Sequence, residues 1–281
     1  MIATNVQRLV RTRLAGVVAP PSVNRVVTPT GQAAALPGQG GVVLGINLGD
    51  PACGWAGDHV EPGLSITHPD PLANAALRRF ACVGNAVTVL DGSAAGARGT
   101  VFGKHGAVLA MLAANDLARV APGDRVAIEA LGVGLAVADE PNTVFHSCSP
   151  TLMARWITGR GADGRLPVPV AAVLPPVAAA AGLGMPAAMF NIDLNTGDPD
   201  IRASAGGHLR FGDIVALLGQ DHRYGRRPDG DWLAVGVIAH GESVAGGHGF
   251  GMMTLLTAPA SRVNLVVSRE ATLALLLDRA S

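Results

Sequence analysis

The chain has 281 residues, of which 49% are hydrophobic and 15% are charged. This composition is too apolar for a disordered chain and suffices for a substantial core in one or two compact units. The 21 basic and 21 acidic side chains give a formal net charge of zero. Strong binding to phosphate backbones needs an excess or a cluster of basic residues, so the composition disfavours a nucleic-acid-binding protein.

The cysteines and the apolar segments give further limits. Cys53, Cys82 and Cys148 lack the spacing of a disulfide framework or of a structural zinc site. Prolines interrupt both the first apolar stretch and the Ala/Val-rich run at residues 168–181, which argues against a signal peptide and a membrane helix. We therefore expect a soluble, cytoplasmic protein that does not associate with membranes.

Short strands dominate the predicted elements, because 37 glycines and 19 prolines divide the chain into short segments. Three strands should each begin at a Gly-Asp or Gly-Asn turn and continue with alternating Val or Ile, at residues 84–90, 123–130 and 212–218. Asp124 and Asp213 are therefore expected to be turn residues. Further strands are expected at residues 42–47, 168–174, 233–239 and 263–268.

Helices should be fewer. Asp70-Pro71 and Ser149-Pro150 each combine a capping side chain with a proline at the first helical position. Helices are therefore expected at residues 72–80 and 151–157, with others at 115–120 and 271–279.

Together these elements predict an α+β, mostly β fold, built from small barrel or SH3-like units with a few short helices. A glycine-rich connection at residues 159–166 suggests a domain boundary. We expect an N-terminal β-rich domain at residues 1–158 and a C-terminal β-rich domain at residues 167–281. The alternative is one intertwined unit.

Residues 54–63 form the first of two glycine-rich segments that carry chemically active side chains. Asp58, His59 and Glu61 could bind a divalent metal, or supply an acid/base group with an orienting carboxylate. Trp55 is a candidate substrate contact. The alternative is a turn-rich connection in which the carboxylates cap backbone amides. The histidine spacing of a helical zinc motif is missing, so the spacing does not identify the metal.

The second glycine-rich segment, at residues 236–251, follows an apolar run. Glycine lets the backbone approach a bound group closely, and such loops at strand ends often carry function. His240, Glu242 and His248 are candidate acid/base residues, and Ser243 is a candidate substrate contact. Ser243 does not lie in a Gly-x-Ser-x-Gly elbow, which disfavours a serine hydrolase.

We predict that the two glycine-rich segments meet in the fold and form one site. The candidate catalytic residues of that site are Asp58, His59, Glu61, His240, Glu242 and His248. Within this set, Asp58, His59 and His248 are the expected ligands of a divalent metal.

The stretch at residues 92–106 is similar to the glycine-punctuated hairpin of KOW-type, SH3-like barrels, many of which bind RNA. A structural hairpin is favoured, although Lys104 and His105 at its turn are candidate contacts for a substrate anion. The stretch is not a Walker loop, because His105 follows Gly103-Lys104. Residues 191–200 lack the register of an EF-hand and are expected to form a turn, in which Asp193 alone could face the site.

Residues 220–226 contain four more candidate substrate contacts, namely Asp221, His222, Tyr224 and Arg226. Arg226 and Lys104 would anchor an anionic group. The alternative is a solvated hairpin tip.

Several strings occur together and in order: residues 54–63, the hairpin at 99–106, residues 209–215 and the final His-Gly loop. With them the chain resembles the prokaryotic domain-of-unknown-function family DUF4438, from about Asn5 to Thr257. The resemblance implies a β-rich fold with barrel-like parts and no established activity. Cys53 departs from the family pattern, which argues against a cysteine nucleophile there.

The leading hypothesis is an enzyme that acts on a polar or anionic small molecule. It would be a hydrolase or a lyase/isomerase with a divalent metal as its cofactor. The alternative is a non-enzymatic ligand-binding or assembly protein whose glycine-rich loops form a subunit interface, and a homo-oligomer is expected. RNA binding through the SH3-like hairpin is less favoured because the net charge is zero.

Overall fold

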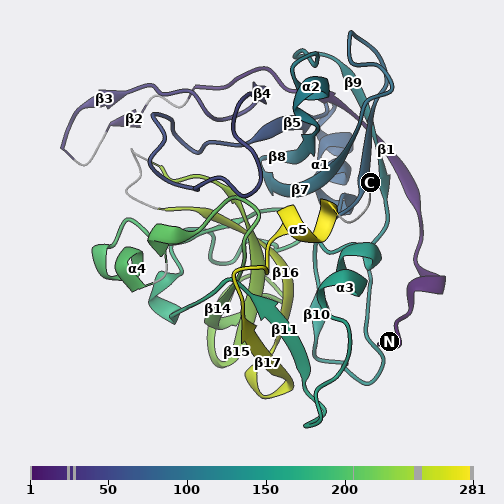
Figure 1. Ribbon diagram of the computed structural model, residues 1–281, viewed down its shortest axis with the longest axis vertical. Helices are drawn as coiled ribbons and strands as arrows, with labels where there is room; N and C mark the ends of the chain where they lie inside the picture. Colours follow the sequence, from purple (N-terminus) through teal and green to yellow (C-terminus); the bar gives the residue numbers. More distant parts are fainter. Residues whose placement is uncertain (1, 24–25, 28–29, 205, 244–248, 279–281) are drawn as a thin grey trace.

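The computed structural model describes residues 2–23, 26–27, 30–204, 206–243 and 249–278. The fold is α+β and mostly β, as predicted, and contains a closed barrel and a few short helices. Two β assemblies dominate it, with the barrel in the upper part of Figure 1 and a second sheet below.

The first assembly is an antiparallel barrel of six strands. Its strands, in spatial order, are β1 (Thr12–Val18), β9 (Arg125–Ala130), β6 (Ala86–Val89), β7 (Arg98–His105), β8 (Ala107–Leu112) and β5 (Gly63–Thr67). Because β1 pairs with β5 as well as with β9, the sheet closes on itself. β4 (Val42–Val43) is added beside β5. Aliphatic side chains fill the barrel, among them Leu64, Ile66, Val101 and Ile128.

The second assembly is a six-stranded sheet. Its main path is β10 (Val144–Phe145), β16 (Gly251–Pro259), β15 (Arg227–His240), β14 (Ile214–Asp221) and β12 (Ala172–Leu174), and β13 (Ile192–Asp193) also pairs with β16. The β12–β14 pair is parallel and the other pairs are antiparallel. Two small sheets complete the strands: β11 (Leu166–Val170) with β17 (Val263–Val267), and β2 (Val26–Val27) with β3 (Ala33–Ala34).

The helices are short, and two of them begin at the predicted caps. Asp70 accepts a hydrogen bond from the Ala73 amide at the start of α1 (Pro71–Phe80), and Ser149 caps α3 (Pro150–Trp156). The remaining helices are α2 (Ala114–Leu117), α4 (Pro199–Ser204), α5 (Leu273–Asp278) and the 3₁₀ turns η1 (Val6–Arg8), η2 (Pro176–Ala178), η3 (Gly206–His208) and η4 (Ala260–Arg262). Among the described helices, none has the length and apolar character that a membrane crossing requires.

Two predicted strands differ from the observed ones. The expected strand at residues 168–174 is split into β11 and β12, because the chain leaves β17 and joins β14. The Ala171 amide, at the crossing, already donates to the Ile214 carbonyl. The expected strand at residues 42–47 ends after Val43, and Gly45 turns the backbone with a φ of +77°.

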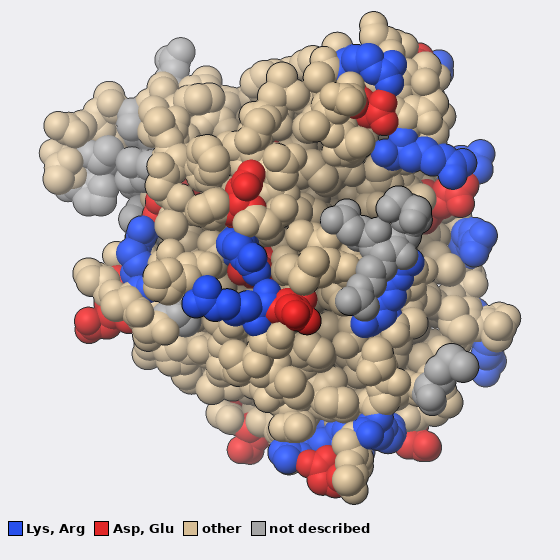
Figure 2. Space-filling model, in the orientation of Figure 1, with Lys and Arg blue, Asp and Glu red and all other residues tan. Residues whose placement is uncertain are grey.

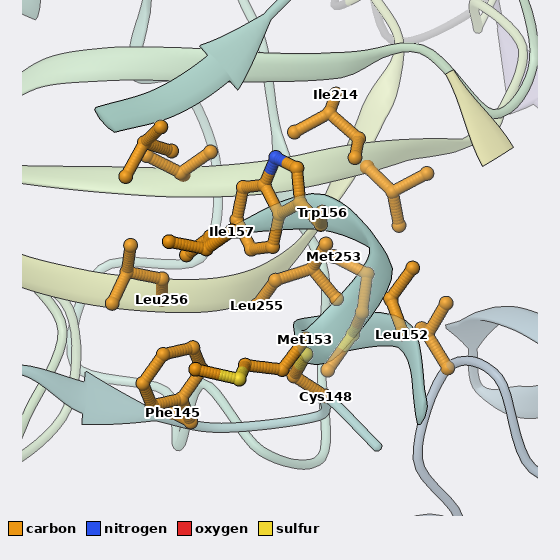
Figure 3. Close-up of a cluster of buried hydrophobic side chains, with 14 of the residues drawn as sticks. Phe145, Cys148, Leu152, Met153, Trp156, Ile157, Ile214, Met253, Leu255 and Leu256 are labelled. Atoms are coloured by element: carbon orange, nitrogen blue, oxygen red, sulfur yellow. The ribbon is translucent and has the colours of Figure 1, made fainter. Parts of the chain in front are cut away.

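The largest hydrophobic cluster lies between the barrel and the second sheet and joins them. It includes Phe102 and Leu109 from the barrel, α3, and residues of β14, β15 and β16. Figure 3 shows the α3 residue Trp156 beside Leu255 and Leu256 of β16. Its indole nitrogen donates to the Pro169 carbonyl at 2.8 Å, so the polar edge of the ring is satisfied inside the core.

The contact between β7 and β15 sets the position of two histidines. A Cβ atom on Gly103 would lie only 2.5 Å from the Ala239 Cβ, so a glycine is required for this close approach. The register of β7 shifts between Val101 and Gly103, as in a β-bulge. The C-terminal residues of the two strands, His105 and His240, are thereby brought together.

Candidate metal centre

Three histidines from separate segments meet between the barrel and the second sheet. His59 lies in the loop before β5, His105 ends β7 and His240 ends β15. Their ring centroids are 4.0 Å apart for His105 and His240, 5.0 Å for His59 and His105, and 5.1 Å for His59 and His240. One ring nitrogen from each lies within 4.8 Å of the other two. The prediction that the glycine-rich segments meet is confirmed, since His59 also donates its amide to the Glu242 carbonyl.

Each of the three rings points its Nδ1 atom at an oxygen. The distances are 2.9 Å from His59 to Asp58 Oδ2, 2.6 Å from His105 to Glu61 Oε1 and 2.8 Å from His240 to the Gly241 carbonyl. An Nδ1–H that donates to such an acceptor leaves the Nε2 lone pair for another partner. Metal-binding histidines are oriented in this way by carboxylates and carbonyls.

The two carboxylates are themselves fixed. Glu61 is buried and accepts hydrogen bonds from the Ser65 hydroxyl at 2.5 Å and from the Gly40 amide at 2.9 Å. Asp58 accepts one from the Ser243 hydroxyl at 3.0 Å, which ties the two glycine-rich segments together. Asp58 was expected to be a metal ligand, but its oxygens are engaged by His59 and Ser243. Its position is that of a residue that orients His59.

His240 is the most enclosed of the three, with a fully buried side chain. Burial, together with the neighbouring His105, lowers the pKa of His240 to about 4, so its ring is neutral near pH 7. Its Nε2 atom lies 2.8 Å from Asn191 Nδ2 and 3.3 Å from Asp193 Oδ1. Asn191 also donates to Asp193 Oδ1 at 2.7 Å. The sequence-based expectation that Asp193 could face the site agrees with this position.

Gly251 makes room for the His240 ring. A Cβ atom at this position would lie 1.9 Å from His240 Nε2 and 2.7 Å from Asn191 Nδ2. The glycine of the second segment therefore allows the backbone of β16 to pass directly beside the imidazole.

The other predicted residues of the glycine-rich segments lie around the cluster. Glu242 accepts a hydrogen bond from the Gly54 amide at 3.0 Å and forms an ion pair with Arg202. Trp55 donates from its indole nitrogen to the Pro51 carbonyl at 2.7 Å. His248, an expected ligand, lies outside the described residues.

Lys104 and Arg226, the expected anchors of a substrate anion, are both buried. Lys104 donates to Ser147 Oγ at 2.8 Å and to the Ala188 carbonyl at 2.7 Å, and burial lowers its pKa to about 8. The Nη atoms of Arg226 donate to main-chain carbonyls of the segment that ends at Asn191. In this arrangement the Lys104 ammonium and the Arg226 Nη atoms therefore contact protein carbonyls and a hydroxyl rather than a substrate.

The remaining candidates belong to the β14–β15 hairpin. Burial raises the pKa of Asp221, but hydrogen bonds from Arg223 and Arg227 outweigh this effect and lower it to about 2. His222 is buried, with Nδ1 2.9 Å from Thr254 Oγ1. Tyr224 is 86% exposed. Only Tyr224 among these three fits the alternative of a solvated hairpin tip.

Three imidazole nitrogens form a donor set that suits Zn²⁺, Fe²⁺, Ni²⁺ or Cu²⁺ better than Mg²⁺ or Ca²⁺. The sequence reasoning assigned His105 to the substrate and not to the metal, and it did not identify Asn191. The one local signal for His105 was its place at a glycine-flanked turn beside Lys104.

The surface in Figure 2 bears on the expected partners. On this face, basic and acidic side chains of the described residues are interspersed, and most of the surface is uncharged. Such a face lacks the continuous basic stripe on which nucleic-acid binding usually depends.

Comparisons with known proteins give the following matches. A family model described as domain of unknown function DUF4438, N-terminal, matches residues 25–154, and its C-terminal counterpart matches residues 156–277. The crystal structure of TM1086 is similar over 97% of this chain and 98% of that chain, with 32% sequence identity and a TM-score of 0.91. No curated protein matches the chain.

Proposed function

The chain belongs to the DUF4438 family, and we propose that it is an enzyme that binds a divalent transition metal at His59, His105 and His240. One observation carries this proposal. Each of the three imidazoles has its Nδ1 atom fixed by an oxygen, and one nitrogen of each lies within 4.8 Å of the others. Burying a ring nitrogen is costly unless it has a partner, and a metal would replace the Asn191 amide as the partner of His240 Nε2.

The charge of the ligand set favours hydrolytic chemistry. Three neutral ligands leave the full charge on the metal, and catalytic zinc sites commonly combine three protein ligands with a water. A metal held in this way lowers the pKa of its water and polarises an oxygen of the substrate. Asp58 and Glu61 fix the orientation of the imidazoles of His59 and His105.

We assign Asp193 as the general base. Its Oδ1 atom lies 3.3 Å from His240 Nε2, at the edge of the histidine cluster. Asn191 holds that same oxygen through a 2.7 Å hydrogen bond. A carboxylate in this position can accept a proton from water or from a substrate carbon. The reaction class that we propose is therefore a hydrolase or a lyase/isomerase acting on a polar or anionic small molecule.

Metal analysis of the purified protein is the first test. We expect close to one equivalent of a transition metal per chain, and a His105→Ala variant should bind it at least about 100-fold more weakly. His208→Ala provides the matched control, because His208 is exposed and lies on η3. Equal metal affinity in the His105→Ala variant and the wild type would refute the site.

Activity is tested separately. The wild type, its chelator-treated form and the metal-restored form are compared on a panel of esters, amides, phosphoesters and hydroxy acids. We expect a turnover that is lost with the metal, returns when it is restored, and falls in Asp193→Asn while the metal stays bound. If the metal binds but no member of the panel reacts in a metal-dependent way, the enzyme proposal fails and the metal site stands.

A further inference from the structure

Arg226 is a buried cation whose known acceptors carry no charge. Its residue is 1% exposed, and its Nη atoms donate to the carbonyls of Gly182, Phe190 and Asn191. Among the described residues its Nε atom has no hydrogen-bond partner. Asp193 lies close enough for its charge to act on Arg226, but its Oδ1 atom is held by Asn191 beside His240.

Two histidines near Arg226 also carry a buried nitrogen atom that lacks a hydrogen-bond partner among the described residues. The Nε2 atoms of His146 and His222 are buried and have no partner within the described part of the chain. His222 is fully buried, and its Nδ1 atom lies 2.9 Å from Thr254 Oγ1. Burial and the Arg226 charge lower the pKa of His222 to about 3 and that of His146 to about 4, and His146 also acts on His222. The His146 amide donates to the Leu255 carbonyl of β16, and His222, four residues before Arg226, contacts Thr254 and Thr257 of the same strand, so the three residues lie in one region of the second sheet.

The charges around Arg226, His146 and His222 favour a negatively charged ligand over a positively charged one. Lys104, a second buried cation, also acts on His146. Asp221 is near, but Arg223 and Arg227 already neutralise it. A metal cation would be repelled by Arg226 and Lys104. An anion would be attracted, and it would accept hydrogen bonds from donors that are otherwise unpaired, which native proteins rarely leave buried.

We propose that Arg226, His146 and His222 form a buried binding site for a small monovalent anion of halide size. Arg226 contributes its Nε–H, and each histidine contributes an Nε2–H. In this tautomer the His222 Nδ1 atom, 2.9 Å from Thr254 Oγ1, would accept a hydrogen bond from the Thr254 hydroxyl. His146 is the partly exposed residue of the three. A monovalent anion would balance the charge of Arg226, whose hydrogen-bond acceptors among the described residues are all carbonyls.

The site is separate from the histidine cluster, but the two share one segment. Arg226 holds the Asn191 carbonyl, and the Asn191 side chain contacts His240. An anion on Arg226 would stabilise the guanidinium that fixes this segment. The inference does not rest on the metal centre or on any activity.

Thermal unfolding of the full chain tests the proposal. Sodium chloride and sodium bromide are titrated against sodium gluconate at constant ionic strength. We expect a saturable rise in Tm with either halide and none with gluconate. The rise should be lost in His146→Leu and kept in His208→Leu, whose histidine is exposed elsewhere. A halide response of equal size in His146→Leu and the wild type would overturn the proposal.

Crystallography of the wild type provides a second test that does not depend on a variant. Crystals soaked in sodium bromide should show an anomalous peak within hydrogen-bond distance of Arg226 Nε. Bromide peaks confined to the protein surface would overturn the proposal. A response to sulfate or phosphate without a response to halides would overturn the assignment of a monovalent ion.

Discussion

Gly251→Ala tests most directly how the backbone of β16 shapes the histidine cluster. The new Cβ atom would lie 1.9 Å from His240 Nε2, whereas nonbonded atoms need about 3.4 Å. The ring must therefore move by about 1.5 Å, or the strand must yield. Metal sites tolerate displacements of only about 0.2 Å, so we expect metal affinity to fall by about 100-fold or more. Overpacking should also lower the free energy of unfolding by about 1–3 kcal/mol.

The assay is a chelator competition that measures the metal Kd, combined with urea unfolding. Gly230→Ala is the matched control, because Gly230 lies in β15 and an added Cβ there meets nothing within 4 Å. The control should keep both its metal affinity and its stability. If Gly251→Ala loses stability but binds the metal as tightly as the wild type, His240 is not a ligand and the reasoning is refuted.

Three further predictions concern Glu61, Gly103 and His222. Glu61→Gln should weaken metal binding about 10–100-fold, because Glu61 orients His105. The control Glu129→Gln changes an exposed carboxylate and should leave the metal Kd unchanged. A metal Kd in Glu61→Gln equal to that of the wild type would contradict the orienting role of Glu61. Gly103→Ala should lower the free energy of unfolding in urea by about 1–3 kcal/mol, because its Cβ atom would lie 2.5 Å from that of Ala239. An unchanged urea midpoint would show that β7 and β15 can move apart without loss of stability. His222 has a pKa of about 3 in the fold against an ordinary value of 6.5, so the unfolded chain takes up its proton first. The contribution of His222 to the free energy of unfolding should therefore be complete above pH 6.5 and fall by up to about 1.4 kcal/mol per pH unit down to about pH 3. His222→Leu should remove this pH dependence. If the free energy of unfolding changes with pH in the same way in the variant and the wild type, the burial argument is contradicted.

The sequence was informative where the physical signal is local. Asp70 and Ser149 cap their helices because capping needs only a side chain and the amide three residues later. The meeting of the two glycine-rich segments was also predicted, from their matching composition. In contrast, the break of the expected strand at residues 168–174 depends on two different partner strands, which local alternation does not reveal.

The role of His105 could not be predicted for a similar reason. Its partner Glu61 and its neighbour His240 are distant in the chain, and their meeting depends on the close crossing of β7 and β15 at Gly103. Lys104, next to it, was a candidate contact for a substrate anion because it lies at the turn of the expected hairpin. The fold instead buries Lys104 against Ser147 and the Ala188 carbonyl.

The three histidines are supplied by a loop, a barrel strand and a strand of the second sheet, so the site exists only when these parts are docked. A bound ion would act as a cross-link that closes two long stretches of chain, and its binding free energy would be added to the free energy of folding. Neither the barrel nor the second sheet could bind it alone with comparable strength. Metal content would then report how much of the protein has completed its tertiary assembly.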